Sequence, residues 1–198
     1  MCGITGILNT IPQPFCRNLF EMTSYIAHRG PDDEGYALIA SPDDLQLFSG
    51  QDTNHYHREK LAPIQSTFNN QIKLGLGHRR FSILDTSHDG HQPWVDSQTG
   101  NVLVFNGEIY NYIELKQELL ARGVGPFTTN TDTEVFGLAY QAWGANCFNK
   151  FNGFWACAIY DKHNNNLILS RDRFGKKPLY IYEVDDSLYF SSEIKSIF

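Results

Sequence analysis

The sequence predicts a globular fold in which helices flank two β-sheets, giving four layers. Apolar segments of strand length occur in both halves of the chain, and stretches with helical periodicity separate them. The 198 residues are 41% hydrophobic and 14% aromatic, which is enough for one well-packed core. We find no internal repeat, low-complexity segment or linker, so a single domain spanning residues 1–198 is expected.

The first half of the chain is expected to supply four strands and one helix. The strands are predicted at residues 3–8, 34–40, 45–49 and 73–84. A helix is predicted after Pro14, where apolar residues share one stripe, namely Phe15, Leu19, Met22 and Ile26. Residues 50–70 are polar and aperiodic, which predicts a solvated loop, with a mobile lid as the alternative. His55 and His57 within it lack a partner at metal-ligand spacing.

The second half alternates strands with two helices. Strands are predicted at residues 101–110, 155–161, 167–172, 179–183 and 188–191. Asn111 with Glu114 resembles a capping pair for one helix, and Thr131 with Glu134 forms a capping box for another. Gly144 is expected to stop the second helix.

Composition and charge exclude several classes of function. The net charge of -6 argues against a nucleic-acid surface and against a polybasic membrane patch. No signal peptide and no apolar run of membrane-spanning length is found. The four cysteines show no CxxC pair and no zinc spacing, so we expect free thiols in a reducing cytoplasm.

Cys2 is a candidate nucleophile. If Met1 is removed, Cys2 carries both a thiol and a free α-amine, and the amine can act as general base for the sulfur. The alternative is a buried cysteine that opens a strand. If Met1 remained, the amine would be blocked and the protein should be inactive.

Three further positions are candidates for substrate contacts. Asn106-Gly107 interrupts an apolar run, and a side-chain amide beside a glycine N–H can hold an oxyanion, although a hairpin turn is the alternative. Arg80 lies in a mostly apolar strand, where it could bind a carboxylate or form a salt bridge. Asp132 could bind an ammonium or simply favour the start of its helix.

Seven motifs strengthen this interpretation when they are taken in order. They are Met1-Cys2-Gly3-Ile4, His28-Arg29-Gly30-Pro31-Asp32, Gly77-His78-Arg79-Arg80-Phe81-Ser82-Ile83-Leu84-Asp85, Gln92-Pro93, Phe105-Asn106-Gly107-Glu108-Ile109-Tyr110-Asn111-Tyr112, Asp132-Thr133-Glu134 and Arg171-Asp172-Arg173-Phe174-Gly175-Lys176-Lys177-Pro178-Leu179. With them the chain resembles the class II glutamine amidotransferase domain, an N-terminal-nucleophile (Ntn) hydrolase. The resemblance is greatest to the version at the front of glutamine-hydrolysing asparagine synthetases.

The resemblance implies a fold, a reaction and a set of roles. The fold would be α+β, a four-layer αββα sandwich of two mainly antiparallel sheets. Cys2 would attack the side-chain amide of L-glutamine and form a γ-glutamyl thioester, releasing ammonia. The implied substrate contacts are Asn106 and Gly107 for the oxyanion, Arg80 for the α-carboxylate, Asp132 with Glu108 for the α-amino group, and the backbone at Ile83 and Leu84 for the pocket wall. Arg29 is expected near the nucleophile, and the 171–179 turn is expected to be structural.

The resemblance also implies a partner for the ammonia. The family continues into an ATP-dependent synthetase domain, whose Ser-Gly-Gly-x-Asp-Ser motif is absent from this sequence. No cofactor or metal is expected in the 1–198 domain, since ATP and magnesium would belong to the synthetase part. Two alternatives stay open: the glutaminase of a different amidotransferase, for example one acting on a surface-polysaccharide sugar, and a catalytically silent docking module. Phe105, where sugar and purine amidotransferases usually have histidine, favours the asparagine synthetase type.

Overall fold

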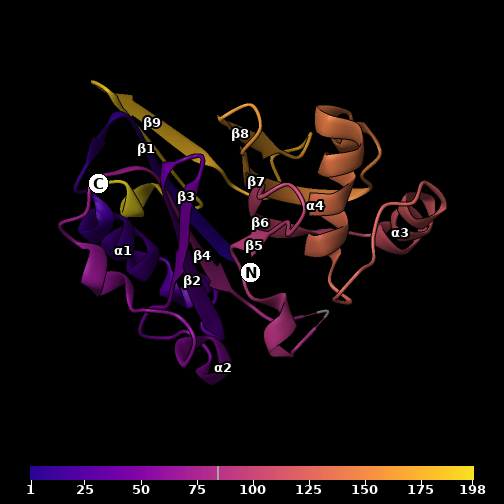
Figure 1. The fold of residues 1–198 in the computed structure, drawn as a ribbon, viewed down its shortest axis with the longest axis horizontal. Helices are drawn as coiled ribbons and strands as arrows, with labels where there is room; N and C mark the ends of the chain where they lie inside the picture. The colour runs from indigo at the N-terminus through magenta and orange to yellow at the C-terminus, as the bar shows by residue number, and fades with distance from the viewer. Residues whose placement is uncertain (84) are drawn as a thin grey trace.

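The computed structural model describes residues 1–83 and 85–198 and contains two antiparallel sheets (Figure 1). The six-stranded sheet has the order β3-β2-β4-β1-β10-β9. Its strands are β1 (Gly3–Gln13), β2 (Asp33–Ser41), β3 (Asp44–Phe48), β4 (Ile72–Arg80), β9 (Tyr180–Val184) and β10 (Ser187–Ser191). The four-stranded sheet has the order β5-β6-β7-β8. Its strands are β5 (Trp94–Val95), β6 (Val102–Ile109), β7 (Gly153–Asp161) and β8 (Asn166–Arg171).

Helices cover the outer face of each sheet. The helices of the described residues are α1 (Cys16–Tyr25), α2 (His55–Arg58), α3 (Tyr112–Ala121) and α4 (Asp132–Trp143), with short 3₁₀ turns at Ala27–Arg29, Ile64–Thr67, His88–Gly90, Gly144–Asn149 and Ile194–Ser196. α1 lies on the six-stranded sheet and α4 on the four-stranded sheet, while α3 packs against the outer side of α4 (Figure 1). The predicted αββα sandwich is therefore confirmed. Within the part of the chain that the structure describes, no helix is long and apolar enough to cross a bilayer.

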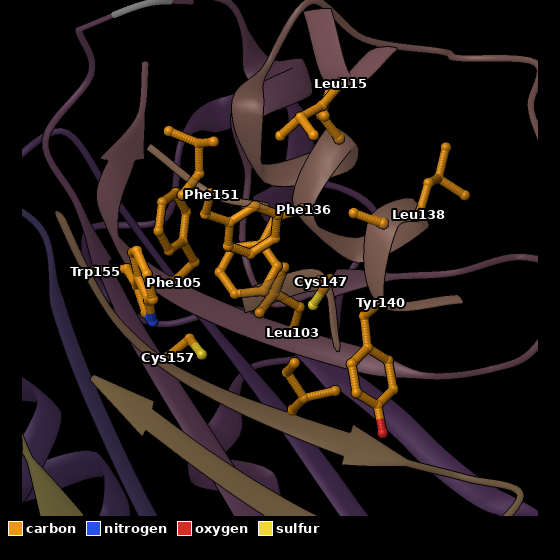
Figure 2. Packing of buried hydrophobic residues seen from close by; sticks show 14 of the residues in the cluster. Leu103, Phe105, Leu115, Phe136, Leu138, Tyr140, Cys147, Phe151, Trp155 and Cys157 are labelled. Atoms are coloured by element: carbon orange, nitrogen blue, oxygen red, sulfur yellow. The ribbon is translucent and has the colours of Figure 1, made fainter. Parts of the chain in front are cut away.

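Three apolar layers hold the sandwich together. Between the sheets lie buried side chains of both, including Ile4, Leu74, Leu76, Val102, Val104 and Phe190. A second layer joins α1 to the six-stranded sheet through Phe15, Leu19 and Met22, as the helical stripe predicted. The third joins α4 to the four-stranded sheet and is rich in aromatic rings, among them Phe105, Phe136, Phe151 and Trp155 (Figure 2). Burial of this apolar surface is the main source of stability for the fold.

The close packing of α1 depends on glycines in β4. Alternate residues of a strand face opposite sides, so Leu74 and Leu76 point between the sheets while Gly75 and Gly77 face α1. A Cβ atom at Gly75 would lie 2.7 Å from Leu19, and one at Gly77 would lie 2.3 Å from the Thr23 hydroxyl. Any larger side chain here would push the helix away from the sheet.

Several local predictions were wrong. Asn106-Gly107 does not interrupt its strand, because β6 continues to Ile109 in register with β7. The Asn111 side chain does not cap α3; instead it bonds to the loop that precedes β7, through the carbonyl of Lys150 and the N–H of Asn152. Residues 50–70 are also more ordered than a plain loop, since they contain α2 and a 3₁₀ turn that buries Ile64.

Candidate active site

Three strands bring polar side chains together at one end of the sandwich. The layer between the sheets includes Ile4 of β1, Leu76 of β4 and Val104 of β6. Side chains an even number of residues away lie on the same face of a strand. Cys2 comes two residues before Ile4, Arg80 four residues after Leu76, and Asn106 two residues after Val104. Gly3 lies opposite Arg79 in the β1–β4 register, which brings the next pair, Cys2 and Arg80, side by side. Cys2, Arg80 and Asn106 line one pocket of about 80 Å³.

The Cys2 thiol lies against the backbone of Phe81. The Phe81 N–H donates to Sγ over 3.3 Å, and the Phe81 carbonyl oxygen lies 3.6 Å from the same sulfur. Burial raises the pKa of the Cys2 thiol and outweighs the neighbouring groups that lower it. The thiol is therefore protonated at neutral pH and requires a base before it can attack. Met1 also lines the pocket.

Arg29 anchors this N-terminal segment, in agreement with the prediction that it lies near the nucleophile. Its Nε donates to the Cys2 carbonyl over 3.0 Å, and its Nη1 pairs with Glu193 at 3.1 Å. Glu193 also accepts from the His28 ring at 2.9 Å. The chain that carries the thiol is thus fixed by a charge pair.

Arg80 faces the pocket without a carboxylate partner among the residues that the structure describes. Its guanidinium donates to two backbone carbonyls, to Ser87 over 2.6 Å and to Asp85. A Cβ atom at Gly90 would lie 2.0 Å from Nη2, so a glycine is required where the guanidinium rests on this loop. The salt-bridge alternative for Arg80 is not realised, and its positive charge is available to an anion in the pocket.

The edge of β6 presents a free N–H to the pocket. The N–H groups of residues 105, 107 and 109 point to the same side, away from β7, because alternate residues of an antiparallel strand share a direction. The Phe105 N–H donates to Gln92 Oε1 over 2.7 Å, and the Ile109 N–H donates to Asp132 Oδ2 over 3.0 Å. The Gly107 N–H lies between them on the same side of β6, and Gly107 lines the pocket. A Cβ atom at Gly107 would lie 2.3 Å from the Phe154 carbonyl, which explains the glycine.

Asn106 places an unsatisfied amide beside this N–H. It is 1% exposed, and neither Nδ2 nor Oδ1 has a hydrogen-bond partner among residues 1–83 and 85–198. An unpaired buried amide is unfavourable, so such groups often mark the position of a ligand. Asn106 and Gly107 together form a donor pair of the kind that stabilises an oxyanion.

Asp132 supplies the opposite charge across the pocket. It begins α4 and is buried, and burial, with a smaller contribution from the charge of Glu108, raises its pKa to about 6. Thr131 caps the helix by accepting from the Glu134 N–H, but Glu134 bonds to Thr128 and Thr129 instead of completing the capping box. Glu108 also lines the pocket, so both predicted acidic residues are present.

The remaining predicted wall is only partly described. Ile83 lines the pocket, whereas Leu84 lies outside the described residues. Sequence reasoning gave no role to Gln92. Its side-chain amide also donates to the Phe105 carbonyl over 3.2 Å, so it bonds to the edge of β6 beyond the point where β5 ends. Lys177 reaches the pocket from the 171–179 turn, and Asp172 organises that turn by accepting from three backbone N–H groups.

Comparison with known proteins agrees with this geometry. Residues 57–198, well over half of the chain, match the glutamine amidotransferase domain. The chain belongs to the glutamine amidotransferase family. Among its relatives is the glutamine-hydrolysing asparagine synthetase 1 of Bacillus subtilis, which is 35% identical across the whole chain. A protein of Gibberella zeae named amidase chry2 is 31% identical over 99% of the chain. The resemblance inferred from the motifs is thereby confirmed.

The amidotransferase chain corresponds to a part of these proteins and to a known fold. It spans 26% of the length of each of the two curated relatives. A solved structure of glutamine phosphoribosylpyrophosphate amidotransferase from B. subtilis, complexed with ADP and GMP, superposes with a TM-score of 0.75. The superposition covers 99% of this chain and 43% of the phosphoribosylpyrophosphate amidotransferase chain, with 23% sequence identity. At this identity the similarity shows a shared fold. Over the described ranges, no group of three or more His, Cys, Asp or Glu side chains is arranged to hold a metal ion.

Proposed function

We propose that this chain hydrolyses the side-chain amide of L-glutamine to glutamate and ammonia, using Cys2 as the nucleophile. The observation that supports this most directly is the convergence of Cys2, Arg80, Asn106 and Asp132 on one pocket. Arg80, which has no carboxylate partner among the described residues, and the buried Asp132 carboxylate line the same pocket. This suits an amino acid with its α-carboxylate and α-ammonium groups. A thiol and two oxyanion donors then face the side-chain amide.

The first half of the proposed reaction forms a thioester. Removal of Met1 frees the Cys2 α-amine, which takes the thiol proton as the sulfur attacks the amide carbon. The Asn106 amide and the Gly107 N–H stabilise the oxyanion of the tetrahedral intermediate. The amine then passes its proton to the departing nitrogen, the C–N bond breaks, and ammonia leaves a γ-glutamyl thioester on Cys2.

The second half reverses the same steps with water. The α-amine takes a proton from a water molecule as its oxygen attacks the thioester carbon, and the same donors hold the new oxyanion. The C–S bond breaks, glutamate is released, and the sulfur recovers its proton. No cofactor is required in this scheme, because the amine supplies the acid and base functions.

We further propose that the ammonia serves an ATP-dependent amidation, with asparagine synthesis as the reaction. The B. subtilis relative is named for that reaction, and it matches the whole of this chain. ATP and magnesium would then act in the synthetase part, as a separate domain or subunit. The amidase relative from G. zeae shares the same segment, so the acceptor is to be tested by offering aspartate and ATP together with the complete protein.

One set of measurements tests the glutaminase proposal. Intact mass establishes whether Met1 is lost, ammonia release measures turnover of glutamine, and a glutamine-analogue diazoketone tests for covalent labelling of Cys2. We expect turnover and labelling in processed protein and neither when Met1 is retained. Folded, processed protein that does neither would leave the silent docking module as the explanation.

Cys2→Ala and Cys16→Ala form a matched pair for this test. Cys16 is buried in the layer under α1, away from the pocket. Cys2→Ala should abolish turnover while glutamine still binds, and Cys16→Ala should keep both activity and labelling. Activity surviving in Cys2→Ala would refute the assignment.

A further inference from the structure

The loop that holds Arg80 is itself held by α2. Arg80 donates to the carbonyls of Asp85 and Ser87, so the direction of its guanidinium depends on where residues 85–91 lie. This segment turns tightly, since the Ser87 N–H donates to Asp85 Oδ1 over 2.8 Å and the His91 N–H donates to the His88 carbonyl. Its internal bonds fix its shape but leave its position on the protein to other contacts.

Two stacked ring pairs fix that position. The His57 ring stacks on His91 with centroids 4.0 Å apart, and the Tyr56 ring stacks on His88 at 3.7 Å. His57 Nε2 also lies 3.0 Å from the His88 carbonyl, to which it donates. α2 thereby contacts both ends of the 88–91 turn.

Asp33 ties the same contacts to the six-stranded sheet. Its carboxylate accepts from the His91 ring at 2.8 Å and from both the backbone and the side chain of Asn54, the residue that caps α2. Burial opposes ionisation of Asp33, but these hydrogen bonds outweigh it and lower its pKa. Burial and the neighbouring His91 lower the pKa of His57, so its ring is neutral at neutral pH and stacks without repulsion.

We propose that α2 and residues 85–91 form a clamp that positions the Arg80 guanidinium for the substrate's α-carboxylate, with His57 as the positioning residue. The inference rests on the proposed function, because it needs glutamine as the substrate. It gives residues 50–70 a role: they support a substrate contact and do not close over the pocket. Loss of the clamp should therefore weaken recognition of the carboxylate and spare the chemistry at Cys2.

The test compares probes with and without a carboxylate on processed, full-length protein. Turnover of glutamine and labelling by the diazoketone need Arg80, whereas alkylation of Cys2 by iodoacetamide does not. We expect His57→Ala to raise KM for glutamine and the half-saturating diazoketone concentration about tenfold, with kcat and the iodoacetamide rate changed less than about twofold. His57→Gln keeps an N–H donor for the His88 carbonyl and should recover part of the loss.

His55→Ala is the matched control. It lies in the same short helix with an 86% exposed side chain, and it should behave as wild type. Tyr56→Ala, which removes the other stack, provides a second variant if His57→Ala does not fold, and it should raise KM in the same selective way.

Two results would overturn the clamp. One is an unchanged KM in folded His57→Ala and Tyr56→Ala. The other is a parallel fall in kcat, iodoacetamide alkylation and melting temperature, which would indicate a general structural role. Wild-type protein that neither turns over glutamine nor takes the diazoketone would instead refute the proposed function, and the clamp with it.

Discussion

Arg79 and Arg80 are neighbours on β4, yet Arg79 pairs with carboxylates and Arg80 bonds to uncharged backbone carbonyls. Arg79 is 2% exposed and pairs with Glu34 at 2.5 Å and with Asp52 at 2.7 Å. Arg80 points to the other face of the sheet, where it lines a pocket and its partners among the described residues are two backbone carbonyls. One guanidinium is therefore neutralised inside the fold and the other is left for a ligand.

Exchanging each arginine for glutamine should separate stability from binding. Hydrogen bonds to charged groups contribute roughly 1.5–3 kcal/mol, so Arg80→Gln should raise KM for glutamine by about 10- to 100-fold. Arg79→Gln leaves the buried Glu34 carboxylate without its charged partner and should lower the free energy of unfolding by roughly 3–5 kcal/mol. Steady-state kinetics and urea unfolding of both variants measure the two effects. The reverse pattern would contradict these roles.

Removing the Asn106 amide should reduce turnover and leave the fold intact. Loss of one oxyanion donor typically costs about 10²–10³ in kcat, and this is the fall expected for Asn106→Ala, with little change in KM. Stability should not decrease, because the amide has no hydrogen-bond partner to lose within the described part of the chain. The measurements are kcat and the melting temperature.

Asn9 provides the control for this substitution. It is also buried, but its Oδ1 accepts from the Ser187 hydroxyl over 2.6 Å, away from the pocket. Asn9→Ala should cost about 1 kcal/mol of stability and leave kcat unchanged. If Asn106→Ala unfolded as readily as Asn9→Ala while keeping its kcat, Asn106 would be a structural residue.

Alternation along strands made much of the site predictable. Once β1, β4 and β6 are recognised, alternation along each strand puts Cys2, Arg80 and Asn106 on the faces that lie between the sheets. The order of the seven motifs along the chain is what identified these residues as site candidates. The prediction that Asn106-Gly107 interrupts its strand was wrong, and the hairpin turn that was the alternative does not form there. Here Gln92 and Asp132, both distant in sequence, satisfy the N–H groups on either side of Gly107, so the strand can continue.

Contacts between aperiodic segments were beyond sequence reasoning. The His57–His91 stack joins residues 34 positions apart through side chains that have no shared period or spacing. The place of Lys177 in the pocket similarly depends on the 171–179 turn, where the Lys177 N–H donates to the Asp172 carboxylate. Neither segment has an apolar pattern that would predict its neighbour, so packing alone decides these contacts.

Asp132 should make glutamine binding pH-dependent. Burial raises the pKa of this carboxyl from 3.8 to about 6, so the folded protein favours its protonated form. The stability that Asp132 contributes is therefore fully present below pH 3.8 and is lost as the pH rises through 6. Only the ionised form attracts an α-ammonium. Affinity for glutamine should therefore weaken about tenfold per pH unit below 6, and binding near this pH should release a proton. Calorimetry of Cys2→Ala protein in buffers of different ionisation enthalpy measures both effects.

Asp132→Asn is the control for that titration. The variant should bind glutamine weakly at every pH and release no proton on binding, because the amide does not titrate in this range. An affinity that stays flat between about pH 5 and 7 in the unmodified pocket would contradict the role of Asp132.

His78 should govern part of the acid stability. It is fully buried, its Nε2 donates to the Phe105 carbonyl over 3.1 Å, and burial lowers its pKa from 6.5 to about 3. Its contribution to stability is therefore present above pH 6.5 and is lost as the pH falls toward 3. At roughly 1.4 kcal/mol per pKa unit, acidification from about pH 6.5 to 4 should cost roughly 3 kcal/mol through this one group.

His78→Leu should remove that loss, because leucine has no proton to bind. Urea unfolding at neutral and acid pH should show a smaller difference for His78→Leu than for the wild type. The same slope for wild type and His78→Leu would show that His78 is not responsible. Since Gln92 also donates to the Phe105 carbonyl, His78→Leu should keep β6 in place and retain activity at neutral pH.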